Sequence, residues 1–179
     1  MATTAKAATK KGAGKSGLQG TTSKDNVNTG IEPNDRKEVA KALQHGLADT
    51  YSLYLKTLGV HWNIVGPSFY SVHKLTEEQY EDLHAAADVI AERIRALGEI
   101  APASFGDYTK LSVVDSSETP RDADAMIRGL ITDNEAIAKR MRDFVEVAEE
   151  ADDVFTADLL TARIGKHEEN AWMLRALIS

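Results

Sequence analysis

The chain has 179 residues, of which 42% are hydrophobic and only four are proline, so it can bury one core of ordinary size and is too short for two large domains. It contains no cysteine, which excludes disulfides, thiolate zinc sites and cysteine nucleophiles, and leaves nitrogen and oxygen as metal ligands. No apolar run reaches about 18 residues and no secretory signal is recognisable, so we expect a cytoplasmic protein that does not enter a membrane.

The net charge of −7 is unevenly distributed. All 28 acidic residues and 16 of the 21 basic residues follow position 24, so residues 1–24 carry +5 and the remainder carries −12. Residues 1–30 are mostly Ala, Thr, Gly, Ser and Lys, and we expect disorder there because little apolar surface is available to bury. We therefore predict a tail over residues 1–30 and one folded domain over residues 31–179. The lysines of the tail are Lys6, Lys10, Lys11, Lys15 and Lys24.

Two long helices are predicted first, and they should form an antiparallel hairpin. The first begins after Pro33, with Asn34 or Asp35 as its N-cap, and the second lies between Ser68 or Ser71 and Gly98. Apolar residues recur in steps of three and four along the first helix, at Val39, Leu43, Leu47, Tyr51, Tyr54, Leu58, Trp62 and Val65. The apolar face of the second helix holds Val72, Leu75, Leu83, Ile90, Ile94 and Leu97.

Residues 99–118 predict a long crossing connection with room for a short helix. Thr119-Pro120 then provides an N-cap and a first-turn proline for a third helix that reaches about Glu150. Ala151-Asp152-Asp153 interrupts the pattern, and a fourth helix continues to the end with the apolar residues Phe155, Leu159, Leu160, Ile164, Trp172, Leu174 and Leu177. The prediction is an all-α protein: a four-helix bundle with one long crossover, which is the ferritin-like arrangement.

Five side chains of metal-binding type stand on the predicted hairpin. His61 lies near the end of the first helix, and the pairs His73/Glu77 and Asp88/Glu92 are each four residues apart on the second. Each pair alone is more commonly part of a solvated face, and a single helical histidine is more commonly a surface group. The hairpin, however, brings the end of the first helix next to His73 and Glu77, so three of these residues should converge.

Asp88 and Glu92 cannot join them within one chain. Fifteen residues of helix separate His73 from Asp88 by roughly 22 Å. If all five residues serve one site, the Asp88 end must come from a second chain lying antiparallel across a two-fold axis, and each interface then holds two equivalent sites.

A site inside the bundle is not predicted. Such a site uses two Glu-x-x-His motifs, and this chain has one, Glu81 to His84, because Ile164 stands three residues before His167. We expect Glu81 and His84 to face solvent, and His45 and His167 to lie at the surface.

One segment carries a recognisable family pattern. It runs from His61-Trp62-Asn63-Ile64-Val65-Gly66-Pro67-Ser68-Phe69 through His73, Glu77 and Asp88 to Ala91-Glu92-Arg93. This pattern resembles the Dps family, the miniferritins that protect DNA in starved bacteria, and the resemblance covers about residues 35–179.

The resemblance implies a dodecameric hollow shell with a ferroxidase site, holding two irons, at each two-fold interface. Iron(II) would be oxidised preferentially by hydrogen peroxide and stored inside as ferric mineral. The family pattern assigns His61, His73 and Glu77 to one subunit, and Asp88 and Glu92 to its partner. Many family members have aspartate where Glu77 stands, so ligation at this position could be direct or through water.

Two further assignments come with the family. Trp62 is either a core residue, as its apolar position suggests, or an electron donor that quenches stray oxidant beside the site. Asp153 and Asp158 belong to an acidic cluster that would line three-fold pores and concentrate cations there.

The lysine tail is either a solubilising extension or the part that binds DNA phosphates without sequence preference, in the nucleoid, with avidity multiplied over many subunits. The alternative function is a structural nucleoid-compacting protein with a vestigial metal site. A bundle enzyme that activates oxygen on an organic substrate is disfavoured by the missing second Glu-x-x-His motif.

Overall fold

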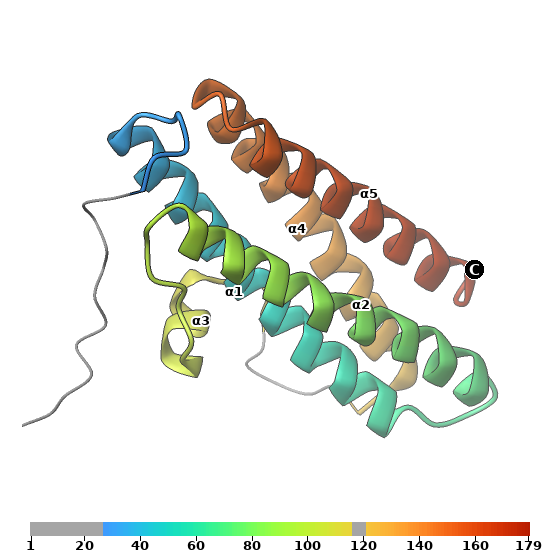
Figure 1. Ribbon diagram of the computed structural model, residues 1–179. Helices are drawn as coiled ribbons and strands as arrows, with labels where there is room; N and C mark the ends of the chain where they lie inside the picture. Colours follow the sequence, from blue (N-terminus) through green and yellow to red (C-terminus); the bar gives the residue numbers. More distant parts are fainter. Residues whose placement is uncertain (1–26, 116–120) are drawn as a thin grey trace, which may run out of the picture.

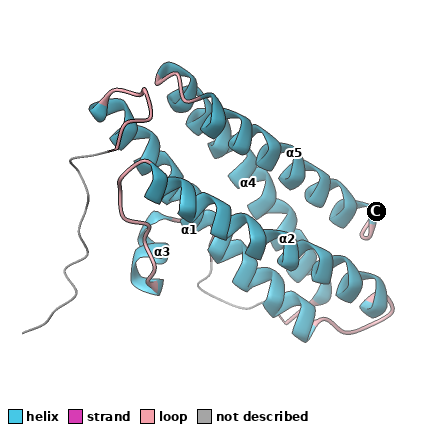
Figure 2. Cartoon of the chain, in the orientation of Figure 1, coloured by secondary structure: helices cyan, strands magenta, loops and turns pink. Residues whose placement is uncertain are grey.

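The computed structural model describes residues 27–115 and 121–179, and in these two ranges it consists only of helices and the loops between them (Figure 2). The predicted all-α bundle with a short helix in its crossover is confirmed. The five helices are α1 (Pro33–Asn63), α2 (Phe69–Ala96), α3 (Phe105–Leu111), α4 (Ala123–Glu150) and α5 (Val154–Ala176). The lysines of the predicted tail lie outside the described residues.

Two antiparallel hairpins form the bundle. Helix α1 packs along α2, α4 packs along α5, and α1 also contacts α4, while the short α3 lies beside α1 at the edge of the bundle (Figure 1). The core between these helices is aliphatic, and its largest fully buried members include Leu43, Leu53, Ile90, Ile137 and Leu160. Burial of this common core fixes the relative positions of the four long helices.

Helix ends differ from the predicted ones by a few residues. Glu32 occupies the N-cap of α1 with Pro33 in the first turn, so the expected caps Asn34 and Asp35 lie inside the helix. The N-cap of α4 is Asp122, whose carboxylate accepts a hydrogen bond from the Ala125 amide at 2.8 Å. The predicted cap, Thr119, lies outside the described residues. Threonine and aspartate are both good N-caps, so the sequence pattern alone does not choose between them.

Two predicted core residues at the end of α1 are exposed. The side chains of Trp62 and Val65 are 65% and 69% exposed. An α-helix turns by about 100° per residue, which places Trp62 about 140° around the helix from Val39 but His61 only about 40° from it. Steps of three and four therefore drifted off the buried face, and the residue that lies on it is His61, at 8% exposure.

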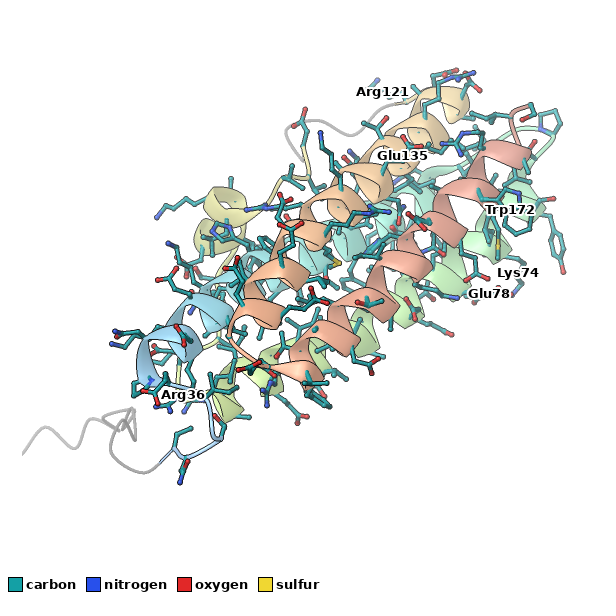
Figure 3. All side chains as sticks on the ribbon, turned by 90° about the horizontal axis from the view of Figure 1, so that it is seen from above. Arg36, Lys74, Glu78, Arg121, Glu135 and Trp172 are labelled. Carbon is teal, nitrogen blue, oxygen red and sulfur yellow. The ribbon has the colours of Figure 1, made fainter. Side chains whose placement is uncertain are left out.

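Two of the apolar residues assigned to the last helix also lie off its buried face. Phe155 and Trp172 are 60% and 63% exposed, and Trp172 stands out from α5 in Figure 3. By helical rotation they lie about 140° and 120° from the buried Leu160. His167 lies about 20° from Leu160, and it is fully buried rather than at the surface.

His167 is held in the core as a neutral ring. Its Nδ1 lies 2.8 Å from the Oδ1 of Asn134 on α4. Burial lowers the pKa of His167 to about 3, and the nearby Arg163 guanidinium adds to this effect. An imidazole that stays neutral at ordinary pH can occupy an apolar core when one of its nitrogens has a hydrogen-bond partner. In His167 that nitrogen is Nδ1, and Nε2 has no partner among the described residues.

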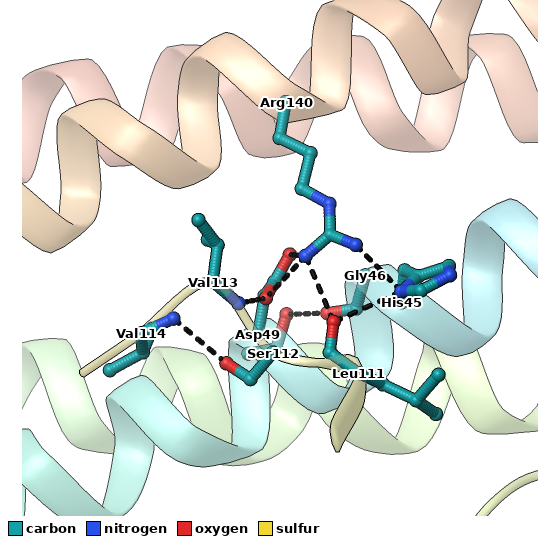
Figure 4. Close-up of polar contacts among 9 residues, drawn as sticks. His45, Gly46, Asp49, Leu111, Ser112, Val113, Val114 and Arg140 are labelled. Carbon is teal, nitrogen blue, oxygen red and sulfur yellow. Dashed lines mark hydrogen bonds and ion pairs between the residues drawn. The ribbon is translucent and has the colours of Figure 1, made fainter. Parts of the chain in front are cut away.

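A second buried polar group anchors the crossover to the bundle (Figure 4). Asp49 on α1 is fully buried, pairs with Arg140 of α4 at 3.2 Å, and accepts a hydrogen bond from the Val113 amide at 2.7 Å. Arg140 also donates to the Leu111 carbonyl at 2.9 Å and to Nδ1 of His45 at 2.6 Å.

Burial still raises the pKa of the Asp49 carboxyl above its ordinary value, although its partners act in the opposite direction. His45 is thus a half-buried member of this network, where an isolated surface histidine was expected.

None of the helices in residues 27–115 and 121–179 combines the length and apolar character of a membrane span.

Candidate metal centre

Two histidines meet where the end of α1 faces the beginning of α2. The His61 and His73 rings are stacked, with centroids 3.8 Å apart and planes inclined by 17°. Phe69 also stacks with His73, at a centroid distance of 5.1 Å, and Tyr80 meets His61 edge-on at 5.1 Å. The aromatic neighbours limit ring rotation, so both imidazoles are held in fixed orientations.

Hydrogen bonds determine which ring nitrogens are free. Nδ1 of His61 lies 2.9 Å from the carbonyl oxygen of His73, and Nδ1 of His73 lies 3.0 Å from the carbonyl oxygen of His61. A carbonyl oxygen only accepts hydrogen bonds, so each Nδ1 carries the proton. In the neutral ring this leaves the Nε2 lone pair available on both histidines. The same backbone support orients histidine ligands in metal sites generally.

Glu77 supplies a carboxylate one turn along α2 from His73. Its Oε2 lies 2.5 Å from the Lys74 ammonium, and the hydrogen bond from Lys74 lowers the pKa of the Glu77 carboxyl. The neighbouring histidines His61 and His73 act on the Glu77 carboxyl in the same direction. A metal at the histidines would compete with Lys74 for this carboxylate.

The other two predicted ligands lie far from this cluster. Asp88 and Glu92 are exposed, four residues apart toward the opposite end of α2. Asp88 lines a groove of about 500 Å³ between α2 and the crossover, together with His84, Tyr51 and Tyr108. Within residues 27–115 and 121–179, no three His, Asp or Glu side chains are arranged to hold a metal ion. One chain therefore holds two partial sets of ligand-type residues at opposite ends of one helix.

Glu81 and His84 are both exposed, as expected, and His84 packs at 5.5 Å from the Tyr54 ring. Trp62 follows His61 in the chain but faces outward, so its indole is exposed at this end of the hairpin and available for contact with another molecule. The alternative that Trp62 fills the core is wrong for the single chain.

The two acidic residues predicted for a pore differ in environment. Asp158 is exposed. Asp153 is only 2% exposed, caps α5 by accepting from the Thr156 amide, and pairs with Arg93 of α2 at 2.7 Å. Burial acts to raise the pKa of Asp153, but hydrogen bonds from Arg93 and Thr156 outweigh it and leave the pKa lowered. The negative charge of Asp153 is thus paired with Arg93 inside the subunit. Asp158 is the more accessible of the two residues.

The sequence of this chain matches the model of the ferritin-like domain over residues 40–179. It is 39% identical over 155 residues to a low temperature-induced protein from Nostoc sp., covering 85% of this chain and 86% of that protein. It is 32% identical over 143 residues to DNA protection during starvation protein 2 from Bacillus anthracis, covering 80% of this chain and 98% of that protein. The crystal structure of a Dps protein from Vibrio cholerae, described as a member of a superfamily of ferritin-like diiron-carboxylate proteins, superposes with a TM-score of 0.80 at 31% identity, covering 86% of this chain and 97% of that one.

Proposed function

Because this chain belongs to the Dps family of ferritin-like proteins, we propose that it oxidises iron(II), preferentially with hydrogen peroxide, and stores the product as ferric mineral inside a hollow shell of twelve copies. Iron is the substrate and cargo of this reaction. The oxidation site lies between two subunits, with His61, His73 and Glu77 from one and Asp88 and Glu92 from the other.

The observation that carries this proposal is the hydrogen-bonding of the histidine pair. Both Nδ1 atoms are used by backbone carbonyls, which presets both Nε2 atoms as metal ligands. A packing role would account for the stacking of the two rings, whereas a ligand role would also use the two free Nε2 atoms beside the Glu77 carboxylate. Imidazole and carboxylate together suit iron(II) and stabilise iron(III) once it has formed.

The spacing along α2 supports a shared site. Asp88 and Glu92 lie too far from His73 to reach the same ion, and both are exposed on the helix surface. A second chain, related by a two-fold axis and with its α2 antiparallel, brings its Asp88 end to the His73 end of the first chain. Each such dimer then completes two identical sites, and neither exists in the separated subunits.

Trp62 has a supporting role in this proposal. Its exposed indole, one residue from His61, would lie against the partner subunit at the oxidation site. There it could give an electron to an oxidant that escapes reaction with iron. Asp158, and Asp153 to a smaller degree because of its pairing with Arg93, would attract cations to the three-fold pores of the shell.

DNA binding is assigned to the lysine tail. The remainder of the chain carries −12 and would be repelled by DNA phosphates, whereas residues 1–24 carry +5 and no acidic residue. A cytoplasmic shell with twelve such tails would associate with the nucleoid through many weak, salt-sensitive contacts.

The test is iron oxidation by the purified shell and by matched alanine variants. Iron(II) and hydrogen peroxide should produce the iron(III) absorbance rapidly in the wild type, and Asp88→Ala or Glu92→Ala should suppress it strongly. Glu81→Ala is the control, because Glu81 is an exposed carboxylate of the same helix outside the proposed site. Absence of oxidation in the wild type would favour the nucleoid-compacting alternative, and equal losses from all three variants would contradict the proposed ligand set.

A further inference from the structure

Four of the five tyrosines of this chain form one continuous row of ring contacts, here called the tyrosine ladder. It begins at His61, whose ring meets Tyr80 at 5.1 Å. From there the ring centroids are 6.4 Å apart for Tyr80 and Tyr54, 5.6 Å for Tyr54 and Tyr51, and 4.9 Å for Tyr51 and Tyr108. These are contact distances for aromatic pairs. The ladder therefore links α2, α1 and α3 without a gap.

The two ends of the ladder lie at the two partial ligand sets of the chain. One end is the stacked histidine pair. At the other end, Tyr51 and Tyr108 line the same groove as Asp88. A side branch from Tyr54 reaches His84, one helical turn before Asp88. Every chain of ring contacts in the described residues that connects these two regions passes through Tyr80 and Tyr54.

Packing alone does not explain why the ladder is made of tyrosine. The side chains of Tyr51, Tyr54 and Tyr80 are half-buried, and their hydroxyls make no hydrogen bond to another described residue. Contacts within the protein therefore do not require the hydroxyl at these three positions. Only the Tyr108 hydroxyl has a protein acceptor, the Pro102 carbonyl, at 2.9 Å. What tyrosine offers and phenylalanine lacks is reversible one-electron oxidation, in which the phenol loses an electron and a proton.

We infer that the tyrosine ladder carries oxidising equivalents between the histidine end and the Asp88 end of each subunit. This inference rests on the proposed function, in which each end belongs to a different iron site of the dimer. The ladder would then connect the two sites, so that a site holding a single iron(II) can draw a second electron from its twin.

The number of electrons that hydrogen peroxide requires explains why a link between the two iron sites would be useful. Hydrogen peroxide takes up two electrons, and one iron(II) gives only one. With Tyr80 as the second donor, peroxide receives one electron from iron(II), and one electron with the phenolic proton from Tyr80. The O–O bond breaks to give one water and one hydroxide, iron becomes iron(III), and Tyr80 becomes a neutral radical.

The radical is then passed along the ladder. An electron moves from Tyr54 to Tyr80, then from Tyr51 to Tyr54 and from Tyr108 to Tyr51. At each step the tyrosine that is oxidised releases its phenolic proton to water, and the radical that is reduced takes a proton up from water. Iron(II) at the twin site finally reduces the last radical, and a proton from water restores the phenol. In sum, two iron(II) ions reduce one peroxide, and no hydroxyl radical is released.

The path can be tested without iron. The chain has no cysteine, so Lys110→Cys, exposed on α3 two residues after Tyr108, gives a single attachment point for a ruthenium photo-oxidant. After a light flash, a spin trap and mass spectrometry of the peptides locate the radical. We expect trapped radical on Tyr80, and we expect Tyr54→Phe to abolish it while trapping at Tyr108 persists. Tyr70→Phe is the control, because Tyr70 is an exposed tyrosine outside the ladder and should change nothing.

A second experiment uses iron and peroxide with less than one iron(II) per site. Tyr54→Phe and Tyr80→Phe should each increase the release of hydroxyl radical relative to wild type and Tyr70→Phe. If the wild type does not oxidise iron, the proposed function fails while the flash experiment still decides the path. Trapped radical on Tyr80 that is unaffected by Tyr54→Phe, or absent in the labelled wild type, would overturn the tyrosine ladder as a path.

Discussion

Complementation between two inactive variants tests most directly whether the iron site is shared between chains. The first variant, His61→Ala/His73→Ala, lacks the imidazoles at one end of α2, and the second, Asp88→Ala/Glu92→Ala, lacks the carboxylates at the other. The two changed regions are roughly 22 Å apart along the helix, so within one chain they do not touch the same site. Shells made of either variant alone should be inactive.

Mixed shells should recover a predictable fraction of the activity. At equal proportions and random pairing, half of the two-fold pairs contain one chain of each kind. Such a pair has one site with both histidines and both carboxylates intact, and one site with neither. About a quarter of all sites should therefore regain a complete ligand set.

The assay is the initial rate of iron(III) formation with hydrogen peroxide, expressed per subunit. The two variants carry different affinity tags, are refolded together, and are purified on both tags in succession so that only mixed shells remain. Size measurements on each pure variant confirm that assembly is intact. This control is needed because alanine at the histidines also removes the reciprocal hydrogen bonds between α1 and α2.

A site contained within one chain predicts a different result. No chain in the mixture then holds a complete ligand set, so every mixed shell stays inactive. Confirmed coassembly without any recovered iron oxidation would refute the shared site.

Three further predictions concern other parts of the chain. Deletion of residues 1–24 should abolish DNA retardation in gels at low salt and leave assembly and iron oxidation unchanged. DNA binding by the full chain should weaken steeply as the salt concentration rises. Undiminished DNA binding by the truncated shell would contradict the tail assignment. His167 has a pKa of about 3 in the folded chain against an ordinary 6.5, so between these two pH values the unfolded chain binds a proton that the folded chain does not. As the pH falls from 6.5 to about 3, the free energy of unfolding should therefore decrease by up to about 1.4 kcal/mol per pH unit. Urea unfolding of His167→Leu should show a pH dependence flatter by about one proton, and an unchanged slope would contradict the neutral ring. Arg93→Ala leaves the buried carboxylate of Asp153 unpaired and should cost about 3 kcal/mol in urea unfolding, whereas Arg128→Ala, which breaks an exposed ion pair, should cost less than about 0.5 kcal/mol.

Much of the fold could be predicted from the sequence because helices leave a strong periodic signal. The interruption at Ala151–Asp153 and the short helix in the crossover both occur where loop-type residues predicted them. The helix starts were less certain, because neighbouring residues such as Thr119 and Asp122 are both suited to capping. The cap observed on α4 is Asp122, and cap propensity alone does not favour it over Thr119.

The errors in the predicted core share one physical cause. Steps of three and four describe a face only over a few turns, because the residues per turn of an α-helix do not divide evenly into that pattern. Over the roughly six turns of α1 between Val39 and Trp62 the pattern moved onto the exposed Trp62, and on α5 it overlooked the buried His167. Counting about 100° per residue from a central core position would have assigned both correctly.

The candidate site was predictable in part for a different reason. The convergence of His61 and His73 follows from the hairpin, since consecutive antiparallel helices must bring these positions together. The choice of tautomer does not follow, because it depends on two backbone carbonyls whose positions are set by the approach of α1 to α2. The Arg140–Asp49 network and the tyrosine ladder were missed because each joins residues far apart in sequence, and no local pattern reports such contacts.

Division of the proposed iron site between two subunits would make iron oxidation depend on assembly. A separated subunit presents two free imidazole nitrogens and a carboxylate held by Lys74, which is too small a ligand set to retain iron firmly. In the proposed dimer, Asp88 and Glu92 of the partner subunit would supply two more negative charges, so the gain in iron affinity would depend on the same contact that builds the shell. Iron oxidation should therefore be confined to assembled protein, where the product iron(III) would form beside the cavity that stores it. The length of α2 would produce this coupling, because it keeps the two halves of the proposed ligand set too far apart to bind one ion within a single chain.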